Sequence, residues 1–265
     1  MTGFTLRKWY LDVVDPAGRS AILYWSALAW GPLTVCWHAA TLHAAGPAPR
    51  HRSSLAAAPE PTVRDGEITW RAEAIGCEAL VRPTMPAVEA ELLPGRGPGE
   101  HGGVTWRCEA PAARTIVRLS GETTIEGTGY AERLELRLPP WRLPIDELRW
   151  GRWISDQGGR SVVWIDWQGA EAQTRVYADA VPAGEAVAGD DEVKADGWRL
   201  TFAGRRVLHE RTLGDLLGSV AARLPAMPRR WLALEDRKWL SRGVLAGPAG
   251  TQDQGWAIHE RIVFP

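Results

Sequence analysis

The sequence predicts an all-β protein built from two barrels or sandwiches in tandem, with one or two short helices. Short apolar or alternating segments recur along the 265 residues, and clusters of Gly, Pro and Asp separate them, which is typical of many short strands. A short sequence pattern also recurs about half the chain apart. Together these observations indicate two related β-domains.

The segment 20–49 contains no Asp, Glu, Lys or Arg, so its length alone permits a membrane helix. Gly31-Pro32 interrupts it, His38 and His43 lie in its second half, and aromatic and β-branched residues are frequent. These features favour strands over a single helix. We therefore predict two buried strands, 20–30 and 33–43, joined at Gly31-Pro32.

The rest of the chain is assigned in the same way. Thr212 is a suitable N-cap for a helix over 213–224, where leucines recur at helical spacing before Pro225. Two segments rich in Gly and Pro, 46–61 and 94–103, are expected to be long, mobile loops. Further strands are predicted over 9–14, 67–75, 105–110, 114–121, 161–167, 174–181 and 198–204.

The repeated pattern contains two glutamates. Residues 128–138 and 254–264 each carry Gly, an aromatic residue and Ala, followed shortly by Glu-Arg and an apolar strand, and Glu132 and Glu260 lie 128 positions apart. The repeat predicts a first domain over 1–125 and a second over 126–265.

Composition excludes several classes of function. The net charge is −1, whereas a nucleic-acid binder usually has a basic excess. Cys36, Cys77 and Cys108 are odd in number and widely spaced, so neither a disulfide framework nor a metal site is expected. His38 and His43, five apart on one predicted strand, face opposite sides.

The first residues carry no apolar signal-peptide region, and we expect a cytoplasmic protein.

Glu132 stands among apolar residues of one strand face. Alternate side chains of a strand share a face, so Glu132 lies in line with Tyr130, Leu134 and Leu136. A buried carboxyl must be paired, hydrogen-bonded or protonated. One interpretation is a structural pair with Arg152 or with an arginine of a neighbouring strand. The other is a carboxyl kept neutral by an apolar pocket and able to donate a proton.

Tryptophan is unusually frequent, with 15 residues against 4 Tyr and 3 Phe. Most are expected to fill cores, but indole faces also line apolar pockets and stabilise a developing carbocation. Asp12, Asp166 and Glu260 are reserve acids, although Asp12 and Asp166 are more typical of strand ends or of pairs with arginine. The candidate substrate-binding residues are Tyr130, Arg152, Trp25, Trp141, Trp150, Trp153 and Trp164.

Several segments resemble the carotenoid 1,2-hydratase (hydroxyneurosporene synthase) family, whose relatives include lipocalin-like pericyclases. "GTGYAERLE" resembles the Gly-Tyr-x-Asp segment of the family, with Glu132 in place of the usual Asp, and "LRWGRW" resembles its Trp-Gly-Arg segment. "LAWGPL" occupies the place of an aromatic-Ser-Pro turn, with Gly31 where Ser is usual. The opening "KWYLDVVDPAGRSAILYW" and the final "QGWAIHERIVF" resemble the corresponding ends of the family.

The resemblance implies two lipocalin-like β-barrel domains and a cofactor-free enzyme. Glu132 would protonate a C=C bond of an apolar isoprenoid or polyene in an aromatic-lined pocket, with Tyr130, Trp150 and Arg152 around it, leading to hydration or cyclisation. Two alternatives stay open: a pericyclase (a Diels-Alder-type cyclase) of natural-product biosynthesis, and a non-catalytic binder of a hydrophobic small molecule. Peripheral contact with a membrane is also compatible with such a ligand.

Overall fold

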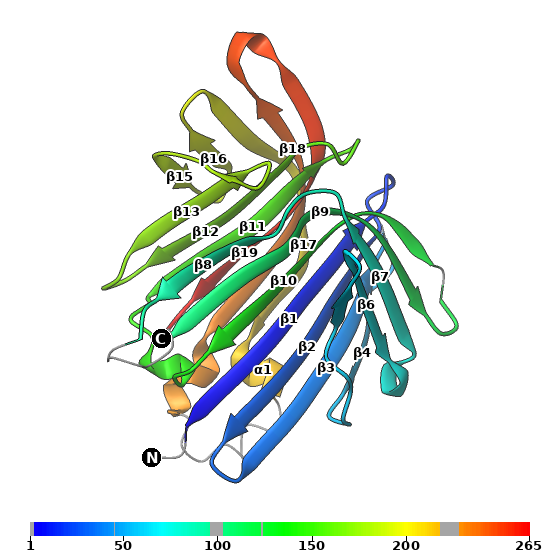
Figure 1. The fold of residues 1–265 in the computed structure, drawn as a ribbon, viewed down its shortest axis with the longest axis vertical. Coiled ribbons are helices and arrows are strands. Elements are labelled where there is room, and N and C mark those ends of the chain that lie inside the picture. Colours follow the sequence, from blue (N-terminus) through cyan, green and yellow to red (C-terminus); the bar gives the residue numbers. More distant parts are fainter. Residues whose placement is uncertain (1–2, 45, 96–102, 123, 218–227) are drawn as a thin grey trace. The chain divides into compact units, whose positions relative to one another are not determined.

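The computed structural model describes residues 3–44, 46–95, 103–122, 124–217 and 228–265. The chain divides into two compact units, Met1–Pro140 and Trp141–Pro265. Each unit is one curled antiparallel sheet, a lipocalin-like half-barrel (Figure 1). The prediction of an all-β protein with two such domains and few helices is confirmed.

The sheet of the first unit has ten strands in the order β4-β3-β2-β1-β10-β9-β7-β6-β5, and β8 also pairs with β9. The chain therefore runs outward along β1 to β4, re-enters at the other edge, and ends on β10 beside β1. The strands are β1 (Phe4–Val14), β2 (Ser20–Trp30), β3 (Leu33–His43), β4 (Arg50–Ser54), β5 (Thr62–Arg64), β6 (Glu67–Ala72), β7 (Cys77–Pro83), β8 (Val88–Leu93), β9 (Val104–Leu119) and β10 (Ile125–Leu136), with the 3-10 helix η1 (Glu73–Ile75).

The nine-stranded sheet of the second unit repeats this order, as β14-β13-β12-β11-β19-β18-β17-β16-β15. Its elements are β11 (Glu147–Ser155), β12 (Ser161–Gln168), β13 (Gln173–Ala178), β14 (Val181–Pro182), β15 (Ala186–Ala188), β16 (Glu192–Ala195), β17 (Trp198–Thr212), β18 (Glu235–Ala246) and β19 (Gln252–Val263), with α1 (Leu213–Leu217) and the 3-10 helices η2 (Pro140–Arg142), η4 (Arg229–Ala233) and η5 (Pro248–Gly250). β10 and β19 are equivalent, since each is the last strand of its unit and pairs with the first.

The boundary between the units lies after Pro140, so the predicted domains 1–125 and 126–265 are corrected. β10 pairs with β1 and β9 and belongs to the first unit together with Glu132. Trp150 and Arg152 lie on β11, at the start of the second unit. The predicted domains place these residues in the same domain as Glu132, whereas the repeated pattern around Glu132 closes the first unit and does not open the second.

Two glycines let the last strand of each unit pass close to the first. A Cβ atom at Gly127 would lie 2.0 Å from the carbonyl oxygen of Val14, and one at Gly255 would lie 2.0 Å from that of Ile154. Gly127 and Gly255 are 128 positions apart, as are Glu132 and Glu260. The two glutamates therefore occupy equivalent positions on equivalent strands.

Both faces of the central strands are buried. In the first unit, the inner face of the curl carries a core that includes Trp9, Leu11, Trp25, Ile68 and Trp70. The opposite, outer face carries Tyr10, Asp12, Tyr130 and Glu132, which are also buried. In the second unit, Trp153, Trp164 and Leu200 belong to the inner core, and Trp150 and Arg152 lie on the outer face. Each central strand thus presents two sets of side chains with different surroundings.

The local predictions agree well with these elements. β2 and β3 cover 20–30 and 33–43 as predicted, and no helix among the described residues is long and apolar enough to cross a membrane. Thr212 Oγ1 accepts a hydrogen bond from the Asp215 N–H at 3.1 Å, as expected of the N-cap of α1. The rest of the predicted helix, 218–224, lies outside the described residues, and so does most of the loop 94–103. The loop 46–61 contains β4.

We expect Gly127→Ala and Gly255→Ala each to destabilise the protein by roughly 3 kcal/mol or more, because a methyl group would overlap backbone atoms that cannot move without separating the strands. The midpoint of urea unfolding measures this loss. Gly159→Ala is the matched control, since a Cβ atom there has no neighbour within 4 Å. Equal midpoints for Gly255→Ala and Gly159→Ala would contradict the close approach of β19 to β11.

Candidate functional site

Glu132 lies at the centre of β10, on the outer face of the first sheet. It stands opposite Tyr10 of β1 and Cys108 of β9, and only 9% of its surface is exposed. Its Oε2 accepts hydrogen bonds from the Trp106 Nε1–H at 2.5 Å and from the Tyr130 hydroxyl at 2.7 Å. Within the first unit, two neutral donors thus converge on one oxygen of the carboxyl group.

An aromatic wall extends from Glu132 across the same face. The ring of Tyr130 lies 6.2 Å from that of Tyr10, Tyr10 lies 5.3 Å from Tyr24, and Tyr24 lies 5.9 Å from Trp37. Of these residues, only Tyr130 is predicted from the sequence. Tyr10, Tyr24, Trp37 and Trp106 come from other strands, and only the strand register places them beside Glu132.

Two of the groups next to Glu132, the Tyr130 hydroxyl and the Cys108 thiol, are neutral near pH 7. Burial raises the pKa of Tyr130 well above its usual value, and the neighbouring Cys108 and Glu132 raise it further. Burial likewise raises the pKa of the Cys108 thiol. The Tyr130 hydroxyl therefore keeps its hydrogen and remains a donor to Glu132.

Glu260, the equivalent residue of the second unit, has a different neighbour. It lies opposite Trp150 of β11 and Lys238 of β18, and Lys238 forms a buried ion pair with it. The Lys238 ammonium also lies 5.1 Å from the centroid of the Trp150 ring. Lys238 occupies the position that Cys108 has in the first unit, so the carboxyl group of Glu260 is matched by a cation.

The remaining predicted residues lie on different faces of the two sheets. Trp25 belongs to the inner core of the first unit, on the face opposite to Glu132, and its Nε1–H donates to the Ala58 carbonyl at 3.0 Å. Asp12 is buried two residues from Tyr10 on the outer face. The structure therefore brings Tyr130 to Glu132 and keeps Trp25 away from it.

In the second unit, Trp150 and Arg152 share the outer face with Glu260, and the buried Arg152 donates from Nη1 to the Trp256 carbonyl at 2.8 Å. Trp153 and Trp164 lie on the inner face, so they are not neighbours of Trp150. Trp141 is half-buried in η2. A role of these residues toward Glu132 stays a prediction.

Asp166 has partners that suit a structural role. It accepts hydrogen bonds from Gln168 Nε2 at 2.8 Å and Thr174 Oγ1 at 2.7 Å, and Arg149 Nη1 lies at 3.2 Å. This agrees with the interpretation of Asp166 as the partner of an arginine.

A buried histidine of the second unit was missed by the sequence analysis. His259 Nε2 lies 2.9 Å from Ser241 Oγ, and the rings of Phe202 and Trp239 lie 4.7 Å and 5.2 Å from the imidazole. Burial, with a smaller contribution from Arg205, lowers the pKa of His259 to about 3. The sequence shows the alternation of β19 but not this enclosure, which depends on pairing with β18.

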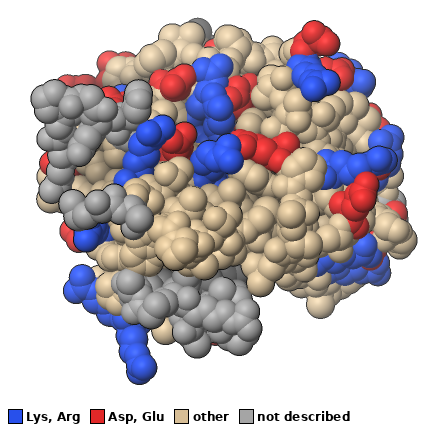
Figure 2. Space-filling model, turned by 60° about the horizontal axis from the view of Figure 1, so that its bottom comes forward, with Lys and Arg blue, Asp and Glu red and all other residues tan. Residues whose placement is uncertain are grey.

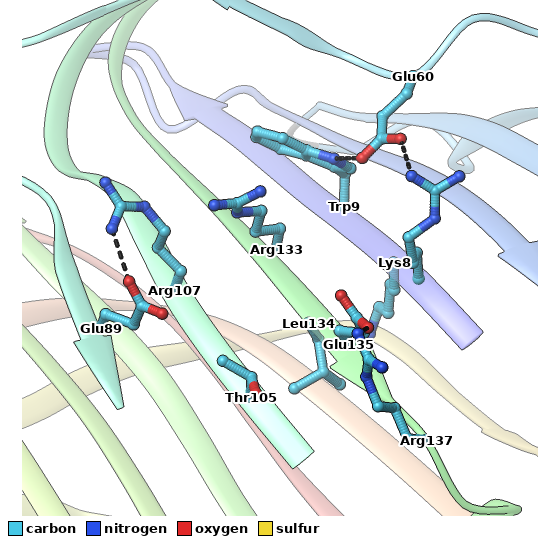
Figure 3. A pocket seen from close by; sticks show the side chains of 11 residues that line it. Lys8, Trp9, Glu60, Glu89, Thr105, Arg107, Arg133, Leu134, Glu135 and Arg137 are labelled. Carbon is cyan, nitrogen blue, oxygen red and sulfur yellow. Dashed lines mark hydrogen bonds and ion pairs between the residues drawn. The ribbon is translucent and has the colours of Figure 1, made fainter. Parts of the chain in front are cut away.

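A cavity of about 330 Å³ opens on the inner face of the first unit, where β1, β9 and β10 meet. Figure 3 shows Arg107, Arg133 and Glu60 around it, with Glu60 directed at Trp9. Its lining is mainly charged, unlike the aromatic-lined pocket that the resemblance implies. Elsewhere, on the face shown in Figure 2, basic and acidic side chains lie beside one another.

No group of three or more His, Cys, Asp or Glu side chains in the described part of the chain is arranged to hold a metal ion.

No family model and no curated protein matches the chain, but solved structures share its fold. A protein from Nitrosomonas europaea provisionally assigned as AttH has a TM-score of 0.55 and 16% identity, over 97% of this chain and 92% of that chain. CghA in complex with Sch210972 has a TM-score of 0.55 and 11% identity, over 99% of this chain and 89% of that chain. Kievitone hydratase from Nectria haematococca has a TM-score of 0.51 and 10% identity, over 99% of this chain and 89% of that chain.

These similarities show that the chain shares its fold with these proteins. At such low identity they establish the fold alone. The specific resemblance to the carotenoid 1,2-hydratase family stays a prediction.

The low pKa of His259 predicts a pH-dependent stability. Below pH 6.5, the usual pKa of an unfolded histidine, the unfolded chain binds a proton that folded His259 binds only near pH 3. Stability should therefore fall with decreasing pH, by up to about 1.4 kcal/mol per pH unit from this residue. His259→Phe should remove this part of the slope in urea midpoints measured from pH 7 to pH 4. His51→Gln, at an exposed position, should keep the full slope. Equal slopes in the unmodified protein, His259→Phe and His51→Gln would refute the assignment.

Proposed function

We propose that the chain is a cofactor-free enzyme that protonates a C=C bond of an apolar isoprenoid or polyene and leads it to hydration or cyclisation, with Glu132 as the acid. The observation that carries the proposal is the carboxyl group of Glu132, nearly buried on an aromatic face and held through one oxygen by Trp106 and Tyr130.

The hydrogen bonds of Glu132 suit a proton donor. Trp106 and Tyr130 both donate to Oε2, so in the acid form that we propose the transferable hydrogen belongs to the other oxygen. The same donors stabilise the carboxylate that remains after the proton has moved to the alkene carbon, which favours the transfer. They also fix the orientation of the group, so little reorganisation is needed during the reaction.

The comparison with the second unit supports Glu132 over Glu260. Glu260 forms a buried ion pair with Lys238, so its carboxyl group is already engaged with a cation. The corresponding neighbour of Glu132 is the Cys108 thiol, which burial keeps neutral.

The aromatic wall provides for the cation that protonation creates. The faces of Tyr10, Tyr24 and Tyr130 are electron-rich and stabilise positive charge. Hydration ends when water attacks the cation and a proton returns to Glu132. Cyclisation ends when a second C=C bond of the substrate attacks and the ring loses a proton to the same carboxylate. Both routes restore the enzyme without a cofactor.

The shared fold supports both chemistries. Kievitone hydratase is named for hydration, and CghA is a pericyclase. A pericyclase is therefore the second candidate, in which the aromatic wall would fold the substrate and Glu132 would only orient it. A binder that carries out no reaction is the third.

Glu132→Gln tests the acid. The amide keeps the shape and accepts the same hydrogen bonds but cannot donate a carboxyl proton, so turnover should fall by about a hundredfold or more while ligand binding persists. Farnesol and geranylgeraniol serve as first substrates, with products identified by mass spectrometry. Glu126→Gln, at an exposed position of the same strand, should retain activity. Undiminished turnover in Glu132→Gln would exclude the acid role.

Reactions in isotopically labelled water distinguish the acid-initiated enzyme, the pericyclase and the non-catalytic binder. In D₂O, an acid-initiated product carries a deuterium on carbon, and a hydration product formed in H₂¹⁸O also gains the heavy oxygen. A pericyclic product is an isomer of the substrate that carries neither label. Bound but unchanged polyene would leave only the binder.

A further inference from the structure

The cavity on the inner face of the first unit concentrates guanidinium groups although the chain as a whole is slightly acidic. Each of these arginines has a glutamate partner: Arg7 binds Glu60 at 2.5 Å, Arg107 binds Glu89 at 2.7 Å and Arg133 binds Glu109 at 2.8 Å. Figure 3 shows the pair of Arg107 and Glu89 on one side of the cavity and Glu60 above Trp9 on the other. The cavity is therefore suited to exchanging one carboxylate for another.

A short segment, residues 57–61, lies against the same face, and we call it the strap. Trp25 Nε1–H donates to the Ala58 carbonyl at 3.0 Å, Trp70 Nε1–H to the Pro59 carbonyl at 3.1 Å, and Trp9 Nε1–H to Glu60 Oε1 at 2.8 Å. Indole nitrogens only donate, so the strap supplies acceptors to three buried donors of the barrel wall. Ala57 and Pro59 are themselves exposed, so one side of the strap contacts the inner face and the other side faces solvent.

Strand register joins the cavity and the strap into one row. Across the inner face, Ser54, His38, Trp25, Trp9, Arg133 and Arg107 are successive cross-strand partners. The strap covers the part with Trp25 and Trp9, and the cavity opens over the two arginines.

His38 lies next to Trp25 in this row and is fully buried. Neither of its ring nitrogens has a hydrogen-bond partner among the described residues. Burial lowers the pKa of His38, so the ring is neutral near pH 7 and offers one donor and one acceptor. Buried polar groups are normally satisfied, which marks this end of the row as a place for a polar atom from outside the chain.

We propose that this row is a binding site for a small molecule with a flat apolar body and a carboxylate, and that Glu60 of the strap is its internal competitor. The carboxylate of the ligand takes the place of Glu60 on Arg7 and Trp9. The body replaces the strap over Trp25 and reaches His38, about two strand spacings or roughly 10 Å away. This site lies on the face opposite to Glu132, so it does not depend on the proposed function.

Glu60→Gln tests the competition, with 2-naphthoate as the ligand and isothermal titration calorimetry as the readout. Removing the charge of the competitor should tighten naphthoate binding about tenfold, because a charge-assisted contact to Arg7 no longer opposes it. When Arg7→Met is added to Glu60→Gln, the gain in naphthoate affinity should be lost. Uncharged 2-naphthalenemethanol should bind weakly and equally to all variants. Both side chains are partly exposed, so these variants keep the fold.

The matched controls are Glu67→Gln and Arg82→Met, which disrupt an exposed ion pair of the same unit. They should leave naphthoate binding unchanged. A naphthoate affinity no higher in Glu60→Gln than in Glu67→Gln, or equal binding of the acid and the alcohol, would overturn the proposal.

A second ligand tests the far end of the row. 6-Hydroxy-2-naphthoate carries a hydroxyl group opposite its carboxylate, and a hydrogen bond to His38 should make it bind about fivefold tighter than 2-naphthoate. His38→Leu should remove this difference and leave 2-naphthoate binding in place. A difference that persists in His38→Leu would overturn the placement of the ligand body.

Discussion

The pairing of β1 with β10 is the constraint on which the rest of the first unit depends. Both faces of these strands are buried around their centres, so their register assigns each side chain there to one of two surroundings. Tyr10, which lies opposite Glu132, begins the aromatic wall. The neighbouring pair, Trp9 and Arg133, lies one residue earlier on β1 and one residue later on β10 and belongs to the inner row. A shift by one residue would exchange the two faces. Gly127 secures this pairing by letting the backbone of β10 approach Val14.

The two units show how one strand design supports different chemistry. β10 and β19 each carry a glycine and a glutamate. β10 lies between β1 and β9, and β19 lies in the same way between β11 and β18. The difference comes from the next strand, which offers Cys108 to Glu132 and Lys238 to Glu260. The chemical character of each carboxyl group is thus decided by a residue that lies far from it in the sequence.

Local features could be predicted from the sequence, and non-local ones could not. Gly31-Pro32 marks the turn between β2 and β3, Thr212 marks the start of α1, and alternation places Glu132 on a mostly apolar face. The boundary was misplaced because the pairing of β10 with β1 joins segments more than a hundred residues apart. The same reason hides Tyr10 and Trp106 as neighbours of Glu132, and it hides the enclosure of His259 by Ser241 and Phe202.

The tight backbone approach at Gly127 and Gly255 also bears on how distant relatives can be found. Proteins with this fold are as little as 10% identical to the chain, so overall similarity aligns them poorly. At these two positions any side chain would strike a carbonyl oxygen, and a relative that keeps the strand pairing must keep glycine. A pair of glycines, each five residues before the buried glutamate of its strand, therefore offers fixed reference points for aligning such sequences where general resemblance has been lost.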